Sequence, residues 1–218
     1  MSEATTGAAL PGTGSAGGRG LSTGARPADR LRAAPRVLAD AVAGTPAREA
    51  ALLISATALL AVAARIAIPL PFTPVPLSLA TLAVLVSGAA LGPRRAVAVA
   101  GLYALLGVAG VPVFAGGQTG WAFASFGYVL GYAAASVLVG WLAARGADRR
   151  MWSAALMGVA GSAMVYATGL VWMVPWLGLS LGEGLAAGVL PFLLGDALKI
   201  AVVAALMPAA WGWRGRRG

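Results

Sequence analysis

Long apolar runs separated by short polar breaks fill the chain from about residue 49 to its end. A helix needs about 20 apolar residues to cross a bilayer, because each residue adds about 1.5 Å and the hydrocarbon core is roughly 30 Å thick. The runs are apolar on every side and lack the alternation of membrane strands. The pattern therefore predicts an all-α integral membrane protein with six transmembrane helices, at residues 50–68, 77–91, 96–111, 121–144, 151–174 and 191–210.

The breaks between the runs differ in character. The string IPLPFTPVP (68–76) contains four prolines, which restrict φ and remove backbone donors, so it is predicted to be a rigid extended connector. The runs 77–91 and 96–111 are short for a span, which predicts that they extend into their loops or that the bilayer is locally thinner. The segment 176–190 is too short to cross and too apolar for a free loop, so we expect it to pack on the outer rim.

The first 48 residues differ in composition from the rest of the chain. They are rich in Gly, Ala, Ser, Thr, Pro and Arg and contain no apolar run that could be buried, which is typical of a disordered tail. No short apolar core follows their charges, so a signal peptide is not expected. The predicted domains are a disordered cytoplasmic tail (1–48), a six-helix membrane domain (49–212) and a basic cytoplasmic C-terminus (213–218).

The basic residues indicate how the helices are oriented. Of the 16, six lie in the N-terminal tail, two in the second connector, three in the fourth and three at the C-terminus, whereas the first, third and fifth connectors have none. Connectors on the cytoplasmic side carry an excess of Lys and Arg. Both termini are therefore predicted to be cytoplasmic, in a multi-pass protein of a bacterial plasma membrane.

Composition excludes several other classes of protein. Hydrophobic residues make up 59% of the chain and charged residues 11%, whereas a soluble domain carries about 25% charge. The absence of cysteine and histidine excludes thiol nucleophiles and zinc sites built on these residues, and we predict neither a metal site nor a cofactor. The net charge of +9 does not indicate nucleic acid, because the arginine-rich N-terminal stretch contains no aromatic residue.

Two basic residues, Arg65 and Lys199, fall inside predicted spans, where each costs about 2.5–3.5 kcal/mol at the bilayer centre. Asp196 lies three residues before Lys199, so the two share one helical face at the depth of a pocket open to the outside. Lys199 is predicted to hold a substrate carboxylate, and Asp196 to accept N–H groups and to keep the lysine charged. A purely structural ion pair remains the alternative, and Arg65 is either a substrate-binding residue or a side chain that reaches the interface.

Aromatic residues are frequent in the outer half of the predicted bundle, where an interfacial belt is the ordinary explanation. Trp121, Phe123 and Tyr128 follow the glycine-rich stretch 113–120, so we predict that they line a pocket for a flat heterocycle. Small residues four positions apart, such as Gly127 and Gly131, predict close packing between helices.

Four strings together resemble the BioY family of biotin transporters, which are substrate-binding S components of energy-coupling factor importers. They are IPLPFTPVPLSLATLAVLVSGAALGPRRA (68–96), GVAGVPVFAGG (107–117), GYVLGY (127–132) and LPFLLGDALKIAVVAAL (190–206). The resemblance implies an S-component-like bundle that binds biotin near its outer face and works with a transmembrane coupling subunit and two ATPase subunits. It also implies that Asp196 and Lys199 bind the vitamin and that Phe114, Gly116 and Gly117 line the site.

The chain departs from the family pattern at three places. It has Ser-Leu-Ala-Thr (78–81) where the family tends to have Thr-x-Gln-Thr, Phe-Ala-Ser-Phe (123–126) where a Gly-Pro-Thr-Gly run is frequent, and Arg65 where Gln is common. The leading interpretation is biotin uptake and not an enzyme. Three alternatives stay open: an S component for another small vitamin with a carboxylate, an assembly subunit, and an integral membrane enzyme that uses Asp196 and Lys199 with Glu183 or Ser125.

Overall fold

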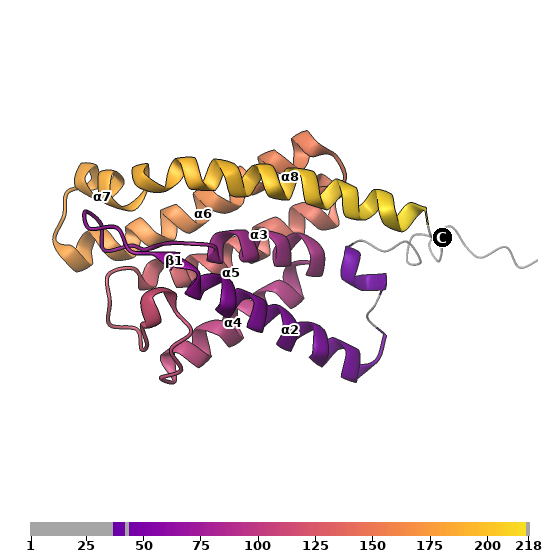
Figure 1. Cartoon of the computed structure of the whole chain (residues 1–218), viewed down its shortest axis with the longest axis horizontal. Helices are drawn as coiled ribbons and strands as arrows, with labels where there is room; N and C mark the ends of the chain where they lie inside the picture. Colours follow the sequence, from indigo (N-terminus) through magenta and orange to yellow (C-terminus); the bar gives the residue numbers. More distant parts are fainter. Residues whose placement is uncertain (1–36, 42–43, 217–218) are drawn as a thin grey trace, which may run out of the picture. The chain divides into compact units, whose positions relative to one another are not determined.

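Six helices of the computed structural model, which describes residues 37–41 and 44–216, correspond to the six predicted spans (Figure 1). They are α2 (Pro46–Arg65), α3 (Ala80–Leu91), α4 (Pro93–Val108), α5 (Phe126–Ala144), α6 (Met151–Leu177) and α8 (Leu193–Gly215). By length and composition α2, α5, α6 and the stretch Leu181–Gly215 can each cross a membrane, and α3 is a shorter apolar helix. The predicted fold class, an all-α membrane protein, is confirmed.

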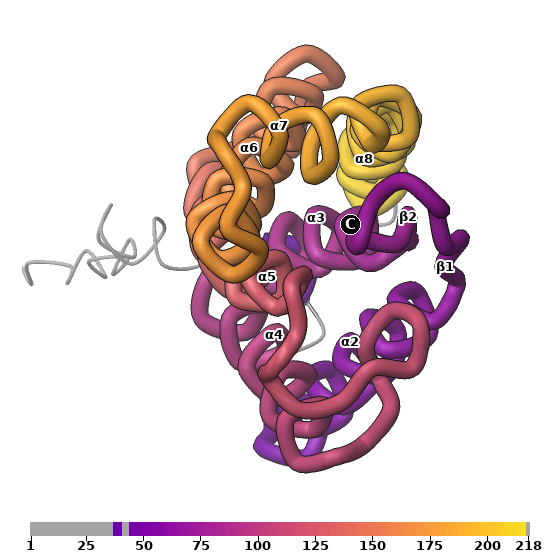
Figure 2. The backbone as a smooth tube through the Cα atoms, turned by 90° about the vertical axis from the view of Figure 1, so that its left-hand side faces the viewer, coloured from indigo at the N-terminus to yellow at the C-terminus, as the bar shows by residue number. Residues whose placement is uncertain are grey.

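Helix α3 lies at the centre of the bundle and contacts α2, α4, α5, α6 and α8 (Figure 2). Most of its residues are buried, including Val84 and Leu85, which are fully enclosed. Of the two predicted explanations for this short run, extension into its loops is wrong, because the helix has 12 residues and begins only at Ala80. A locally thinner bilayer stays a prediction. A short helix is tolerated here because its ends meet other parts of the protein instead of lipid.

Glycines allow α5 and α6 to approach closely, as their spacing predicts. A Cβ added at Gly127 would overlap Trp172 Cβ and would lie 2.8 Å from the carbonyl oxygen of Thr168. A Cβ at Gly131 would overlap the Thr168 hydroxyl and lie 3.0 Å from Val165 Cα. Without side chains at these two positions the backbones come together, which is how membrane helices gain packing contacts.

The connectors of α2–α3, α4–α5 and α6–α8 gather at one end of the bundle (Figure 1). The proline-rich connector is flanked by two short antiparallel strands, β1 (Ala67–Ile68) and β2 (Leu77–Ser78), with Ala67 opposite Ser78. The α4–α5 connector contains the 3₁₀ turn η2 (Ala115–Gly117). The segment predicted to pack on the rim forms α7 (Leu181–Gly188), which contacts α6 and the following 3₁₀ turn η4 (Leu190–Phe192).

Each helix differs from its predicted span by two to five residues at one end or at both. Residues 121–125 are not helical, so α5 starts at Phe126. Helix α6 continues through Pro175 to Leu177, and a proline near a helix end is tolerated because few backbone bonds are lost. The last helix α8 begins at Leu193, after η4, and runs to Gly215 instead of residue 210. A proline in the sequence therefore predicts where a helix ends only to within one helical turn.

At the opposite end the chain enters the bundle through the 3₁₀ turn η1 (Leu38–Ala41) and α2. Arg95 of α4 binds the Glu49 carboxylate at 2.6 Å and the Asp40 carboxylate at 2.8 Å. Helix α2 starts at Pro46, capped by Thr45, slightly before the predicted domain boundary at residue 49. The remainder of the predicted tail, residues 1–36 and 42–43, lies outside the described residues, as do 217–218 of the predicted C-terminus.

Candidate binding site

The predicted pair on the last helix forms a buried ion pair. Lys199 Nζ lies 2.8 Å from Asp196 Oδ1, and the two residues are only 7% and 5% exposed. The other carboxylate oxygen, Asp196 Oδ2, accepts a hydrogen bond of 2.7 Å from the hydroxyl of Tyr166 on α6. Both oxygens are thus paired, while an ammonium group with three donors retains two for another acceptor. The lysine is therefore a charged donor held in place by its neighbours.

Two adjoining cavities meet beside this pair, at the end of the bundle that carries α7. The cavity next to the ion pair is lined by Val75, Pro76, Leu77, Ser78, Thr81, Tyr128, Tyr132, Val165, Tyr166, Phe192, Asp196 and Lys199. The second is lined by Val75, Pro76, Ser78, Tyr103, Phe114, Ala115, Gln118, Phe123, Ser125, Tyr128, Val129 and Tyr132. The five shared residues show that the cavities are two halves of one site, with an ionic half and an aromatic half.

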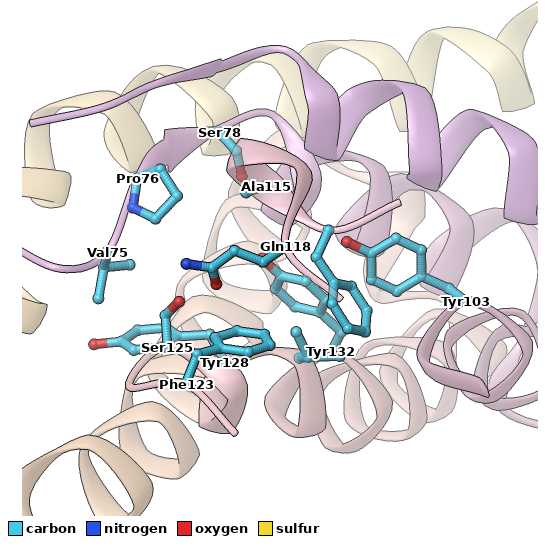
Figure 3. Close-up of a pocket in the computed structure, with 12 residues that line it drawn as sticks. Val75, Pro76, Ser78, Tyr103, Ala115, Gln118, Phe123, Ser125, Tyr128 and Tyr132 are labelled. Atoms are coloured by element: carbon cyan, nitrogen blue, oxygen red, sulfur yellow. The ribbon is translucent and has the colours of Figure 1, made fainter. Parts of the chain in front are cut away.

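The aromatic half is shaped by the α4–α5 connector. Phe114 is buried edge-on against Tyr103, with ring centroids 5.3 Å apart, and its ring lies where a Cβ at Gly107 of α4 would be. The side chain of Gln118 extends between the segment Val75–Pro76 and Ser125 (Figure 3). An amide supplies both donors and an acceptor, so this wall can bind either kind of polar ligand atom.

The structure places the predicted site residues in two groups. Asp196, Lys199, Phe114 and Tyr128 line the cavities, and Tyr128 lines both halves while its hydroxyl donates to the carbonyl oxygen of Gly188. Gly116, Gly117, Trp121 and Arg65 line neither half.

The four residues that line neither half lie in the α4–α5 connector and at the end of α2. Gly116 and Gly117 have φ of +70° and +78°, so they form the turn that carries Ala115 and Gln118 to the cavity. Trp121 is 56% exposed, as expected for the interfacial belt. Arg65 is exposed, and its Nη1 donates to the carbonyl oxygen of Pro112 at 3.0 Å.

Sequence reasoning missed most of the polar lining. All four tyrosines of the chain and its only glutamine, Gln118, line one half or both, and of these only Tyr128 was predicted, along with the only lysine, Lys199. The residues missed are Tyr103, Tyr132, Tyr166 and Gln118. Their rarity was an available signal, because a hydrogen-bonding side chain inside an apolar bundle costs free energy unless it is paired or functional. Among the described residues no group of three or more metal-ligating side chains comes together.

The two halves are small in this structure, with volumes of about 30 and 40 Å³. A volume of this size holds only a few water molecules, since one water needs roughly 10–15 Å³ by the same measure. A ligand much larger than a few water molecules therefore does not fit the two halves in the arrangement that this structure shows.

Comparison with known proteins identifies the family. The model of the BioY family matches residues 34–216. The probable biotin transporter BioY of Pyrococcus horikoshii is 32% identical over 155 residues, which are 71% of this chain and 91% of that protein. The biotin transporter BioY of Thermotoga maritima is 34% identical over 154 residues, covering 69% and 88%. That of Rhizobium etli is 36% identical over 156 residues, covering 66% and 81%.

A solved structure shows the same fold. The S-component for biotin from an ECF-type ABC transporter superposes with a TM-score of 0.67 and 23% sequence identity, covering 81% of this chain and 96% of that one. At this identity the likeness concerns the arrangement of the helices. Together with the match of the family model over most of the sequence, it shows that the chain is a multi-pass plasma membrane protein that belongs to the BioY family.

Proposed function

We propose that the chain captures biotin for uptake across the plasma membrane, as the substrate-binding subunit of an energy-coupling factor transporter. The curated relatives are named biotin transporters, and the structural neighbour is an S-component for biotin. The observation that carries the proposal is the buried Asp196–Lys199 pair, which faces a cavity lined by four tyrosines and one glutamine. Biotin combines a carboxylate, a ureido group and an apolar ring system, and this site offers a partner for each.

The residues have distinct proposed roles. Lys199 donates to an acceptor oxygen of the vitamin, and Asp196, positioned by Tyr166, accepts from its N–H groups. The rings of Phe114 and Tyr128 pack against the apolar part of the ligand. Gly116 and Gly117 shape the turn, and Trp121 covers it from the interface.

The enzyme alternative does not apply to a transporter subunit, and the geometry agrees. The Glu183 carboxylate accepts hydrogen bonds from the backbone and hydroxyl of Ser180, so it caps α7. Ser125 lines the aromatic half, whereas Lys199 lines the ionic half. The family is one of transport proteins, and the chain is not an enzyme.

The chain works in a membrane-embedded complex with other subunits. We propose that these subunits are one transmembrane coupling subunit and two ATPase subunits. ATP hydrolysis has to come from other subunits because the sequence contains no Walker motif.

The proposed orientation has both termini in the cytoplasm. It is supported by the described arginines other than Arg65, which lie at the end of the bundle opposite to the cavity.

Equilibrium binding of radiolabelled biotin to the purified full chain in detergent tests the proposed function. We expect saturable binding at one site that unlabelled biotin displaces and that a vitamin with a carboxylate but no ureido ring displaces at least tenfold less well. A folded preparation that does not bind biotin, or that binds another carboxylate vitamin more tightly, would contradict the proposal and support the alternative cargo.

Arg65 is proposed to act on this site through the α4–α5 connector. Its hydrogen bond to Pro112 joins the end of α2 to that connector, and the same nitrogen would lie 2.7 Å from a Cβ at Gly117. We expect Arg65→Gln to raise the dissociation rate of biotin by about fivefold, which corresponds to roughly 1 kcal/mol for one exposed hydrogen bond to a charged donor. The rate is measured by chasing bound labelled biotin with unlabelled biotin.

Arg48→Gln is the matched control, because Arg48 is exposed at the other end of the same helix. It removes one guanidinium and should leave the dissociation rate unchanged. An unchanged rate in Arg65→Gln as well would show that this contact does not hold the connector over the site.

A further inference from the structure

A rigid cluster of charged and aromatic side chains lies at the end of the bundle opposite to the cavity. We call Asp148, Arg149, Trp211 and Arg214 the Trp211 cluster. Asp148, in the 3₁₀ turn η3 (Ala147–Arg149) between α5 and α6, is fully buried, and its Oδ2 accepts a hydrogen bond of 2.5 Å from Trp211 Nε1. The bond fixes the indole ring of α8 against the α5–α6 turn.

The indole ring in turn positions two arginines. The guanidinium carbon of Arg149 lies 4.6 Å from the centroid of the Trp211 ring, and that of Arg214 lies 5.4 Å from it. The two guanidinium carbons are therefore within about 10 Å of each other. The oxygens of one phosphate group can accept hydrogen bonds from two guanidinium groups that approach it from different sides, and each guanidinium can donate two.

Within the described residues, one carboxylate, that of Asp148, adjoins the arginines at the ends of α5, α6 and α8. These arginines are 145, 149, 150, 214 and 216, and none forms an ion pair within the described residues. One oxygen of the Asp148 carboxylate is bound to Trp211. Burial raises the pKa of the Asp148 carboxyl. Its other oxygen, Oδ1, is buried and makes no hydrogen bond to any described residue.

Arg95 on α4 provides a contrast at the same end of the bundle. Its guanidinium binds the carboxylates of Glu49 and Asp40, so its charge is met within the chain. In the Trp211 cluster, by comparison, Arg214 Nη1 is buried and makes no hydrogen bond to any described residue. A buried donor without an acceptor is costly, so this place favours an anion supplied from outside the chain.

We propose that the Trp211 cluster binds the phosphate of one anionic phospholipid. The cluster lies where three membrane-spanning helices end, which is the level of the lipid headgroups. Tryptophan is suited to this level because its ring is apolar and its N–H is polar, and arginine on the cytoplasmic side attracts the anionic leaflet. Arg149 is exposed and can reach the headgroup first, while Arg214 is half-buried and meets the phosphate from below.

Native mass spectrometry of the full chain in detergent, titrated with dioleoylphosphatidylglycerol or dioleoylphosphatidylcholine, tests this site. We expect one phosphatidylglycerol adduct that forms at least tenfold more tightly than the phosphatidylcholine adduct. The double variant Arg149→Gln/Arg214→Gln should lose that preference. The control Arg48→Gln/Arg94→Gln removes two exposed arginines from the same end of the bundle and should keep it.

Several outcomes would overturn the proposal. If both double variants lost the preference for phosphatidylglycerol equally, the lipid would be attracted by the overall positive charge and not by this cluster. If neither variant lost the preference, the lipid would bind elsewhere. Displacement of the adduct by millimolar inorganic phosphate would show a site for free anions instead. A wild-type unfolding midpoint of the Arg149→Gln/Arg214→Gln variant in detergent confirms that it is folded, so this test is independent of the proposed function.

Discussion

Lys199→Ala is expected to raise the dissociation constant for biotin at least tenfold, which corresponds to about 1.4 kcal/mol. The substitution removes the one cation of the ionic half and leaves the Asp196 carboxylate with Tyr166 as its hydrogen-bond donor. A buried carboxylate without its counter-charge is also costly for folding. The measurement is equilibrium binding of labelled biotin, with size-exclusion chromatography of the same sample to show that the protein is folded.

Two further variants separate binding from stability. The double variant Asp196→Asn/Lys199→Met removes both charges while keeping the side-chain volumes, so we expect a folded protein that binds biotin as poorly as Lys199→Ala. Leu198→Ala is the matched control, because Leu198 is adjacent on α8 but 70% exposed on the outer surface. Wild-type affinity in the folded double variant would refute a role of the pair in binding.

Gly127→Ala is expected to lower the free energy of unfolding by about 1–3 kcal/mol, since overpacking forces backbone shifts. The added methyl group overlaps Trp172 Cβ and approaches the Thr168 carbonyl oxygen, so α5 and α6 must separate. Separation also disturbs the hydrogen bond from Trp172 Nε1 to Phe123 O, beside the aromatic half of the site. Thermal unfolding in detergent measures the effect, and biotin affinity should fall in parallel.

Gly101→Ala in α4 provides the opposite control. A Cβ at Gly101 meets no atom within 4 Å, so the same change only increases helix propensity. We expect Gly101→Ala to raise the free energy of unfolding by about 0.5–1 kcal/mol. If both variants shifted the unfolding midpoint in the same direction, the effect at Gly127 would not come from the α5–α6 contact.

The features that the sequence predicted correctly depend on neighbours along the chain. Six apolar runs correspond to six helices because the length of a span is set by the thickness of the bilayer. Asp196 and Lys199 pair because residues three apart share a helical face, whatever the rest of the bundle does. The small-residue spacing likewise predicted close packing at Gly127 and Gly131, although not that the partner helix is α6.

Helix boundaries were predicted less well, and the reason is also physical. The run 77–91 was expected to lengthen or to lie in a thinner part of the bilayer, yet α3 has only 12 residues and is surrounded by other helices of the bundle. Residues 121–125 are apolar enough for a helix but belong to the connector that covers the aromatic half of the site. Hydropathy records burial and does not distinguish burial in lipid from burial in protein.

The sequence by itself determined the class of protein, the number of spans, the i, i+3 ion pair and the family. Only the tertiary structure showed that Tyr166 donates to Asp196, that all four tyrosines and Gln118 line the two halves of one site, and that Arg65 donates to Pro112 of the α4–α5 connector. Tyr166 and Asp196 are 30 positions apart in the sequence, and Arg65 and Pro112 are 47 positions apart. Such pairs meet because of the angles and depths at which helices pack, and those follow from glycine contacts between helices that no pattern within one helix contains.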